Sequence, residues 1–278
     1  MFKRLSLFLL PLLLTAKPFV VGDLEGQLGN QLFIIATTVS LALDHDATPI
    51  FPDLKKKKLY NIPINRKEVF SHLHSRLPDN AEYSYHYREP HYHYAKIPYR
   101  PDMRISGYFQ SEKYFAHHKQ EILALFAPPP KILAYLTEKY SDIITHPDIV
   151  SIHVRFYHED PEQKCHLAPR RAFYEKAITY FPPDTQFIVF SNQMEQCKEL
   201  LAGLDRNLRY IENEEYYHDF YLMSLCKHNI LSNSSFAWWA AYLNQNPSKI
   251  IIAPKAWNNP AYGLDTKDLI PDEWIAIY

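Results

Sequence analysis

The second half of the chain alternates short apolar runs with segments of helical periodicity, and this alternation limits the possible folds more than any other feature. Strand-like runs occur at IVSIHV, FIVFS, LRYI, HNILSN and KIIIAP, and helical patterns separate them at 170–180, 194–202, 216–227 and 235–245. A helix between two successive strands indicates that the strands pair in parallel, because a parallel pair needs a long crossover connection whereas an antiparallel pair can be joined by a short turn. The second half therefore predicts a parallel α/β sheet, in which ligands bind at the carboxyl ends of the strands.

The first half shows weaker signals of the same kind. The predicted elements are strands at 19–24, 49–51 and 103–107 and helices that begin at about 30, 111 and 128. Residues 60–101 are rich in Tyr, His and Pro and show no clean period, so we expect an irregular stretch there. The prolines at 128–130 favour a boundary between an N-terminal, acceptor-side lobe over 18–130 and a C-terminal, nucleotide-sugar lobe over 131–278.

Charge and composition exclude several classes of protein. Lys and Arg number 30 against 31 Asp and Glu, so the net charge of -1 gives no basic field, and nucleic acid is not expected as a partner. Hydrophobic residues make up 47% of the chain, which indicates a globular protein with a buried core. The cysteines at 165, 197 and 226 lie far apart, so neither a zinc knuckle nor a disulfide framework is predicted.

The N-terminus carries a feature typical of export or membrane attachment. Lys3 and Arg4 precede an apolar run of about a dozen residues, which is too short to span about 30 Å of hydrocarbon. We expect a signal-like or membrane-anchor segment over 1–17. The alternatives are an amphiphilic extension that packs on the domain and a misassigned start codon.

Polar side chains follow three of the predicted strands of the second half, where ligands are expected. They are His153 and Arg155, then Ser191 and Asn192, then Asn233, Ser234 and Ser235. An arginine fork and the free amides of a helix N-terminus together suit a diphosphate. Taken singly, Arg155 equally fits a surface ion pair and the serines an ordinary helix cap, so the prediction depends on their convergence.

Glycines cluster near the first strand, although the chain has only 6 of them. The turn Gly26-Gln27-Leu28-Gly29-Asn30-Gln31 joins the first strand to the first helix, and glycines there let the backbone approach a ligand closely. The spacing is neither GxGxxG nor that of a P-loop, which disfavours dinucleotide and ATP sites. Gly26, Gly29, Asn30 and Gln31 are therefore candidates for contacts with a different phosphate-containing donor.

Two features that suggest metal binding have simpler interpretations. Asp44-His45-Asp46 resembles a DxD metal motif, but it lies where the first helix should end, and we interpret it as a solvated helix terminus. The histidines of the tract at 83–94 fit stacking against sugar rings better than metal ligation. No metal ligand is predicted. The pair Trp238-Trp239 is interpreted as core packing.

Four segments carry a resemblance to a known family. They are GQLGNQLF at 26–33, SGYFQSEKYF at 106–115, VFSNQMEQCKELL at 189–201 and DFYLMSLCKHNILSNSSFAWWAAYLN at 219–244. Together with NPSKIIIAPKAW they resemble the family 11 glycosyltransferases, the α-1,2-fucosyltransferases, from about Phe19 to Trp257. The resemblance implies a GT-B-like α/β fold with two Rossmann-like lobes and parallel sheets. It also implies cofactor-free, metal-independent transfer of fucose from GDP-fucose, with inversion, to the 2-hydroxyl of a galactose-containing glycan.

The family's first motif reads H-x-R-R-x-D, and this chain has His153-Val154-Arg155-Phe156-Tyr157-His158. The first arginine is present, while phenylalanine and histidine replace the second arginine and the aspartate. The resemblance assigns the grip on the diphosphate to Arg155. Glu89, His153, Glu159 and Asp160 are the candidate general bases, and the sequence does not choose among them. Tyr94, Tyr108 and Gln110 are expected on the acceptor side.

Two other functions remain open at this point. One is a protein that binds a GDP-sugar without transferring it, because the second arginine is missing. The other is a transferase for another GDP-sugar or linkage. Since GDP-fucose is made in the cytosol, we expect a membrane-associated, cytosol-facing enzyme, with a cytoplasmic one as the alternative.

Overall fold

The computed structural model describes residues 17–56, 58, 59, 62, 63, 68–79, 81–158, 160 and 164–278. The second half forms a six-stranded, fully parallel sheet in the order β12-β11-β10-β7-β8-β9. Its strands are β7 Ile149–Val154, β8 Gln186–Ser191, β9 Asn207–Tyr210, β10 His228–Ile230, β11 Ile251–Pro254 and β12 Ile275–Ile277. The chain starts in the middle at β7, builds outward to β9, and returns to add β10 on the other side of β7. The strand order therefore reverses between β7 and β10.

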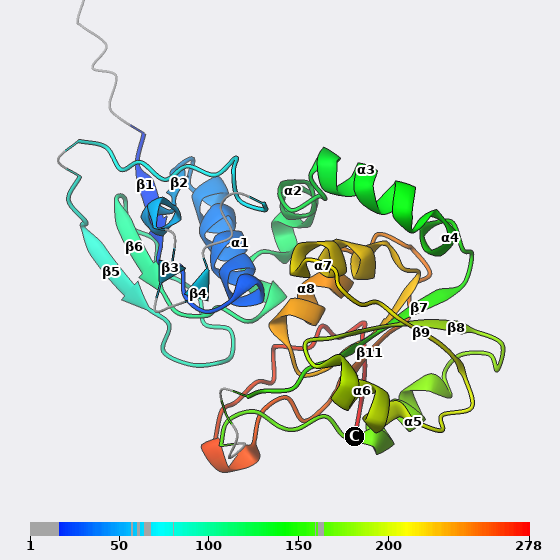
Figure 1. Cartoon of the computed structure of the whole chain (residues 1–278). Coiled ribbons are helices and arrows are strands. Elements are labelled where there is room, and N and C mark those ends of the chain that lie inside the picture. The colour runs from blue at the N-terminus through cyan, green and yellow to red at the C-terminus, as the bar shows by residue number, and fades with distance from the viewer. Residues whose placement is uncertain are drawn as a thin grey trace, which may run out of the picture.

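Helices cover both faces of this sheet (Figure 1). One face packs against α5 Arg171–Ile178 and α6 Met194–Leu201, and the other against α7 Tyr216–Leu225 and α8 Ser235–Leu243. Alternate residues of β7 point to opposite faces, so Ile152 joins the cluster under α5 and α6 while Ile149 joins the cluster under α7 and α8. Every residue of β7 is buried, as expected for a central parallel strand.

The N-terminal sheet is smaller and has the parallel order β2-β1-β6-β5. Its strands are β1 Phe19–Gly22, β2 Thr48–Ile50, β5 Tyr85–Arg88 and β6 Met103–Ser106. The helix α1, Leu28–Asp44, covers one face. On the other face, Leu77 and Ala81 from a loop pack against Phe19, Val21 and Ile50. A separate antiparallel pair is formed by β3 Lys58–Leu59 and β4 Ile62–Pro63.

The remaining helices lie within each lobe and between the two sheets. They are η1 Pro52–Lys55, η2 Glu112–Tyr114, η3 Ala116–His118, α2 Lys119–Leu125, α3 Pro130–Lys139, α4 Ser141–Ile144 and η4 Pro260–Tyr262.

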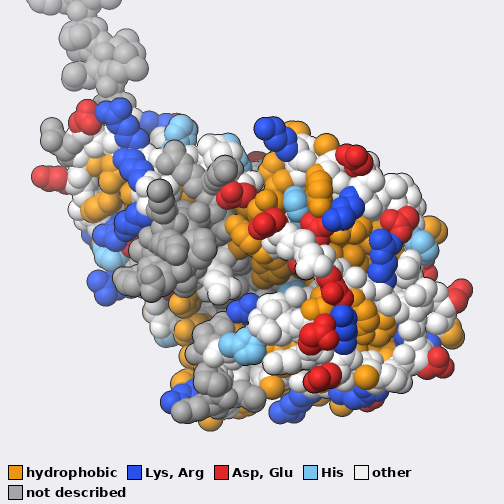
Figure 2. Space-filling model, viewed as in Figure 1, with side chains coloured by type: hydrophobic (Ala, Val, Ile, Leu, Met, Phe, Trp, Pro, Cys, Tyr) orange, Lys and Arg blue, Asp and Glu red, His pale blue; other side chains and the backbone are white. Residues whose placement is uncertain are grey.

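Acidic and basic side chains are interspersed over the visible face of the C-terminal lobe (Figure 2). Within the described residues, no helix has both the length and the apolar character that crossing a bilayer requires.

The largest apolar cluster runs through both lobes. Phe33 of α1 lies with its ring centre 4.5 Å from Trp238 and 5.1 Å from Trp239, and Phe115 stacks on Trp239 at 5.3 Å. Both tryptophans are fully buried, so their interpretation as core residues is confirmed. The lobes therefore share one core across the contact between α1 and α8.

Most predicted elements are present, but residues 60–101 are not irregular throughout. The strand β5 lies within this stretch and pairs in parallel with β6. Only Tyr87 of β5 is buried, because β5 is the edge strand of its sheet, and an edge strand shows little apolar patterning. The helix predicted from Ser111 is a single 3₁₀ turn, η2, whose first amides include that of Lys113, bonded to the Ser111 hydroxyl. The predicted leader over 1–17 lies outside the described residues except for Lys17, and the lobe boundary at 130 stays a prediction.

Candidate active site

The carboxyl ends of β7 and β10 lie side by side where the strand order reverses, which is where open parallel sheets bind ligands. His153 from β7 and Ser232 after β10 join these ends through a 2.7 Å hydrogen bond between Nδ1 and the hydroxyl. Burial, together with the nearby Arg155, lowers the pKa of His153 to about 3. The imidazole is therefore neutral at ordinary pH. It can exchange hydrogen bonds with a ligand, but it is a weak base.

Arg155 lies just past β7, with its guanidinium carbon 5.0 Å from the centre of the Tyr157 ring. Tyr157 in turn donates a 2.6 Å hydrogen bond to the carbonyl of Asn233 and stacks on the His166 ring at 3.9 Å. The aromatic ring thus links the ends of β7 and β10 beneath the arginine. Arg155 is half-buried, and Tyr157 connects it to Asn233, two residues before the N-terminus of α8, where the first amides and the helix dipole favour negative charge.

The polar residues after β8 bond to the backbone of the loop after β7 and of their own turn. The Asn192 side chain accepts a 2.9 Å hydrogen bond from the Phe156 amide and donates one of 2.8 Å to the Phe156 carbonyl. The Ser191 hydroxyl bonds within its own turn to the backbone of Gln193. Phe156, which stands where the family motif has its second arginine, packs against the apolar cluster under α5 and α6. A donor contact by Ser191 or Asn192 stays a prediction.

Asp160 closes the loop that follows the motif. Its carboxylate accepts the amides of Lys164, Cys165 and His166 at 2.8–2.9 Å, and it also contacts the His166 ring. Hydrogen bonding, first of all from the His166 amide, holds the pKa of Asp160 well below its usual range. A carboxylate with so low a pKa is a poor proton acceptor, which disfavours Asp160 as a general base. Glu159, the other candidate in this loop, lies outside the described residues.

The glycine turn of the N-terminal lobe lies directly against the start of α8. A Cβ atom on Gly29 would stand 2.4 Å from the Phe236 amide nitrogen and from the Ser235 carbonyl carbon, so only glycine fits there. The close approach inferred from the sequence is therefore to another part of the chain, and a ligand contact by Gly29 stays a prediction. Gln31 is fully buried and donates to the Gly26 carbonyl at 2.8 Å, which stabilises the turn.

Asn30 connects the two lobes. Its side-chain oxygen accepts a 2.8 Å hydrogen bond from the Gln110 amide and another of 2.8 Å from the Ser235 hydroxyl. Ser234 is the N-cap residue of α8, without a side-chain cap bond. The Asn233 amide donates to the carbonyls of Leu167 and Trp257 at 3.2 and 3.1 Å. Several residues predicted to bind the donor thus also fix the position of α8.

Glu89 lies past the carboxyl end of β5 and binds the next loop of the same lobe. One carboxylate oxygen accepts the amides of Tyr108 and Phe109 at 2.8 and 2.9 Å, and the other accepts the Tyr114 hydroxyl at 3.3 Å. Gly107 adopts φ +145, and a Cβ there would lie 2.3 Å from that of Glu89. Burial raises the pKa of Glu89 although these donors oppose the rise. Its proton affinity suits a base, and its hydrogen bonds also make it a structural clamp.

Glu25, between β1 and the glycine turn, is a candidate that the sequence reasoning missed. Tyr92 and Tyr108 lie with ring centres 6.4 Å apart, and burial raises the pKa of both, with the Glu25 charge adding to the shift. Glu25 itself makes no hydrogen bond or ion pair with any other described residue. The sequence did offer one signal: Glu25 follows a strand of a parallel sheet, and ligands bind at the carboxyl ends of such strands.

Asp219 on the first turns of α7 is another residue that was missed. Burial, and then the charge of Glu214, raises the pKa of Asp219 to about 7. One of its oxygens is buried and has no hydrogen-bond partner among the described residues. Phe220, the next residue, contacts Phe236 of α8, whose ring lies 5.7 Å from that of His153. A buried carboxyl oxygen without a partner is suited to bind a polar ligand group.

The acceptor-side candidates are spread along the N-terminal lobe. Tyr108 lies beside Tyr92 and Glu25, whereas the Tyr94 backbone amide is bonded to Asp268 at 3.0 Å and its ring is 4.9 Å from that of Tyr114. An apolar pocket of about 90 Å³ opens at the ends of β10, β11 and β12, next to the segment after β10 that belongs to the candidate donor site. Its lining includes Pro169, Arg170, Phe173, Ser232, Asn233 and Tyr278.

The sequence profile of glycosyl transferase family 11 matches residues 18–278, nearly the whole described chain. The chain belongs to glycosyltransferase family 11. This confirms the resemblance inferred from the four sequence segments and gives the protein glycosyltransferase activity.

Individual members of the family 11 glycosyltransferases align over much of the chain. An α-1,2-colitosyltransferase from Escherichia coli is 28% identical over 291 residues, which cover 93% of this chain and 98% of that protein. The O-antigen biosynthesis glycosyltransferase WbnK from Escherichia coli is 32% identical over 65% of this chain and 63% of its own. Galactoside α-(1,2)-fucosyltransferase 2 from Oryctolagus cuniculus is 26% identical, with coverage of 78% and 65%.

Solved structures show the same fold at low sequence identity. The NodZ α-1,6-fucosyltransferase, known from Bradyrhizobium and solved with soaked GDP-fucose, has a TM-score of 0.50 and 14% identity and covers 82% of this chain and 93% of its own. An Arabidopsis thaliana FUT1 variant in complex with GDP has a TM-score of 0.50 and 13% identity, with coverage of 86% and 70%. The GT-B-like fold of the family 11 chain, predicted from the sequence, is confirmed.

Proposed function

We propose that this family 11 enzyme transfers fucose from GDP-fucose to the 2-hydroxyl of a galactose unit in a glycan, with inversion and without a metal. The observation that carries the proposal is that Arg155 lies over Tyr157, whose hydroxyl bonds to Asn233 just before α8, where the strand order reverses and the glycine turn of the other lobe packs against the start of α8. Relatives named as α-1,2 transferases and a fucosyltransferase of the same fold with GDP-fucose support this choice of donor and linkage.

The leaving diphosphate sets the main chemical demand. As the bond to the sugar breaks, the sugar gains oxocarbenium character and negative charge grows on the diphosphate oxygens. Arg155 offers a planar set of N–H donors, and the first amides of α8 add aligned dipoles. Removal of one well-placed donor of this kind costs about 3–4 kcal/mol of transition-state stabilisation, or a factor of about 10²–10³ in kcat.

The incoming hydroxyl needs a base on the side of the sugar opposite the diphosphate. We assign this role to Glu25, because its carboxylate has no hydrogen-bond partner among the described residues and lies near Tyr92 and Tyr108, which suit stacking against a sugar. Glu89, the candidate from the sequence, is the second choice because three donors already bind it.

The two glutamates can be separated by experiment. Glu25→Gln should lower kcat by about 10²–10⁴-fold while leaving the Kd for GDP and the Tm unchanged. Glu89→Gln should lower the Tm, because an amide nitrogen cannot accept the hydrogen bonds that the carboxylate accepts. If Glu25→Gln keeps full activity, the base is elsewhere, and Glu89 becomes the first candidate.

A second donor is favoured by one observation, the E. coli colitosyltransferase that aligns over 93% of this chain. Colitose is fucose that lacks the 3-hydroxyl group. A site that hydrogen-bonds this hydroxyl rejects the deoxy sugar by about 10⁴–10⁵-fold, whereas an apolar site does not. The ratio of kcat/KM for GDP-fucose and GDP-colitose therefore decides between the two donors.

The test of the proposal is transfer of labelled fucose from GDP-fucose to terminal galactosides, with and without EDTA, by wild type, Arg155→Lys and Arg155→Ala. We expect transfer that resists EDTA, falls about 10²–10³-fold in Arg155→Ala and recovers only in part in Arg155→Lys, which lacks the planar fork. Undiminished transfer by Arg155→Ala would refute the assignment of Arg155. Calorimetric binding of GDP without transfer of either sugar would favour a GDP-sugar-binding protein that lacks transfer activity.

A further inference from the structure

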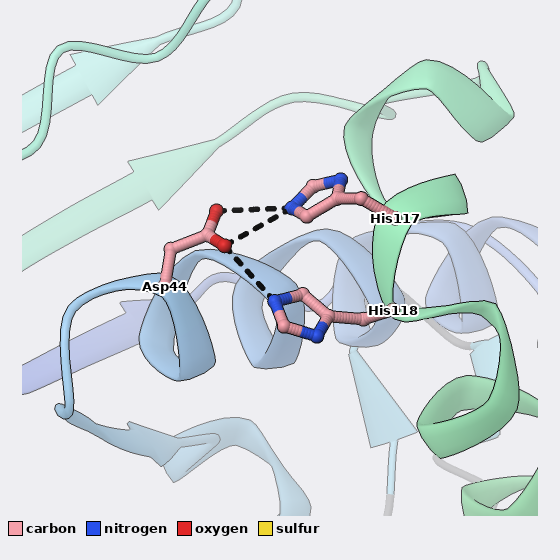
Figure 3. A group of neighbouring side chains, drawn as sticks. All are labelled: Asp44, His117 and His118. Atoms are coloured by element: carbon pink, nitrogen blue, oxygen red, sulfur yellow. Dashed lines mark hydrogen bonds and ion pairs between the residues drawn. The ribbon is translucent and has the colours of Figure 1, made fainter.

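A carboxylate and two imidazoles converge at the far end of α1 from the donor site (Figure 3). Asp44 is the last residue of α1, and His117 and His118 belong to η3. The Asp44 oxygens lie 3.0 and 3.1 Å from Nε2 of His117, and one of them lies 2.9 Å from Nε2 of His118. Both rings therefore point the same nitrogen at one carboxylate.

This arrangement is unusual for consecutive residues. In a 3₁₀ helix, neighbouring side chains leave the axis about a third of a turn apart, so they normally diverge. Here His118 has φ -114 and ψ 32 at the junction with α2, and this turn of the backbone brings the two rings to a centroid distance of 4.6 Å. This bend directs the His118 ring toward the Asp44 carboxylate, which the His117 ring also faces.

The three side chains match the ligand chemistry of a zinc ion. Their ligating atoms all lie within 4.8 Å of one another. Two ligands of a tetrahedral Zn²⁺, each about 2.0–2.1 Å from the metal, are about 3.3 Å apart. The nitrogen–oxygen separations of 2.9–3.1 Å need to widen by a few tenths of an ångström, and the two imidazole nitrogens, which lie within 4.8 Å of each other, need to settle at a similar spacing; the partly exposed side chains allow both changes. Two imidazoles and a carboxylate with an open fourth position are a common Zn²⁺ ligand set.

A second carboxylate lies near the outer nitrogen of His118. A Glu121 oxygen lies 3.8 Å from Nδ1 of His118, on the side of the ring that faces away from Asp44. The Ser40 hydroxyl, on the preceding turn of α1, lies 3.2 Å from Nε2 of His117, the nitrogen that also faces Asp44, so this contact must give way when that nitrogen binds a metal. A carboxylate near the outer nitrogen favours the tautomer that leaves Nε2 free for a metal.

We propose that Asp44, His117 and His118 bind one Zn²⁺ ion, with water as the fourth ligand. The ion ties the end of α1 to the segment that leads into α2. Fourteen residues of helix separate Asp44 from Asn30, about 21 Å at 1.5 Å per residue, so the ion has a structural role and takes no part in sugar transfer. The solvated helix terminus expected at Asp44-His45-Asp46 is present, because α1 does end at Asp44; Asp46 forms an exposed ion pair with Lys17, whereas Asp44 faces the histidines.

The test uses the full chain after removal of metal with EDTA. Titration with ZnCl₂ should show one equivalent bound, and Co²⁺ in place of Zn²⁺ should give the visible absorption of a tetrahedral site. At a hundredfold excess of Zn²⁺ over its Kd, the Tm should rise by about 5 °C. His117→Ala and His118→Ala should each weaken Zn²⁺ binding by about 100-fold or more, since even lost outer contacts cost 10–100-fold.

Two further variants separate loss of the metal ligands from loss of the fold. Asp44→Asn keeps the size of the side chain and one acceptor oxygen, but it lacks the carboxylate charge and should lose the metal. A Tm equal to that of the metal-free wild type would show that a folding defect does not account for the loss. His72→Ala removes an exposed histidine elsewhere and should bind Zn²⁺ as the wild type does. Equal Zn²⁺ affinity in the wild type and the His117 and His118 variants would overturn the proposal. These readouts do not depend on transfer activity, so they stand apart from the proposed function.

Discussion

Replacement of Gly29 by alanine tests whether contact between the lobes sets the geometry of the donor site. Gly29 lies within α1, where alanine is favoured over glycine by about 1 kcal/mol. The new Cβ, however, would stand 2.4 Å from the Phe236 nitrogen and the Ser235 carbonyl carbon, both backbone atoms that cannot rotate away. Ordinary contact begins at 3.4 Å, so α1 and α8 must separate by about 1 Å.

The two effects have opposite signs, and overpacking is the larger. Extra carbon atoms in a closely packed contact cost about 1–3 kcal/mol, which leaves a net loss of up to about 2 kcal/mol after the gain in helix propensity. For a chain of this size that corresponds to a fall in Tm of up to about 4 °C. Because the displaced helix start is part of the proposed diphosphate site, a 1 Å shift should lower kcat/KM by about 100-fold.

The assay combines thermal unfolding, calorimetry with GDP and transfer kinetics. Gly203→Ala is the matched control, because Gly203 has φ +73 and no atom near its Cβ position. That substitution strains the backbone by about 1–2 kcal/mol without moving either lobe, so it should lower the Tm but leave GDP binding and kcat/KM unchanged. An unchanged or raised Tm together with wild-type GDP affinity in Gly29→Ala would refute the close contact between α1 and α8.

Three other substitutions test particular contacts. Asn30→Ala should lower stability by about 2 kcal/mol in thermal unfolding, because it leaves the Gln110 amide and the Ser235 hydroxyl unpaired, and an unchanged Tm would contradict this. Burial would raise the pKa of Glu214, but hydrogen bonds from a lysine, two tyrosines and a histidine lower it to about 2. Glu214 therefore stabilises the folded state by about 3 kcal/mol, in full above about pH 4.5, and this contribution is lost as the pH falls toward 2. The free energy of unfolding in urea should show this loss in wild type but not in Glu214→Gln. Phe156→Arg, which restores the motif's second arginine, should lower the Tm without raising kcat, because the ring packs against the cluster under α5 and α6; a rise in kcat would show that the new side chain reaches the donor.

Sequence periodicity was sufficient for the C-terminal lobe. The strands β7, β8, β10 and β11 were predicted because most of their residues are buried in continuous apolar runs, and the edge strand β9, which has no buried residue, was predicted from its short run LRYI between two helical patterns. Sequence periodicity failed to predict β5, because that edge strand buries only one side chain of four. β12, a short edge strand after a long irregular stretch, likewise had no flanking helical pattern.

The sequence also placed the polar groups at the correct ends of the strands, but it did not reveal what they bind. Asn192 and Asp160 look like ligand-binding residues in the sequence, and in the structure their side chains bind the backbone of nearby loops. Such pairings depend on loop geometry, which has no periodic signal. Glu25 was overlooked for the opposite reason, since the glycines that follow it dominate the local pattern.

The helix α1 explains why so many motif residues have structural partners. Near its start, Gly29 and Asn30 contact α8, in its middle Phe33 packs on the paired tryptophans of α8, and at its end Asp44 meets the histidines of η3. A residue that fixes α1 against α8 also fixes the position of the α8 amides, and through them the proposed diphosphate site. The motif at the start of α1 therefore serves the arrangement of the lobes as much as contact with the donor. Direct contact with the reacting groups is left to fewer side chains, of which Arg155 and Glu25 are the two that transfer kinetics can test separately from folding.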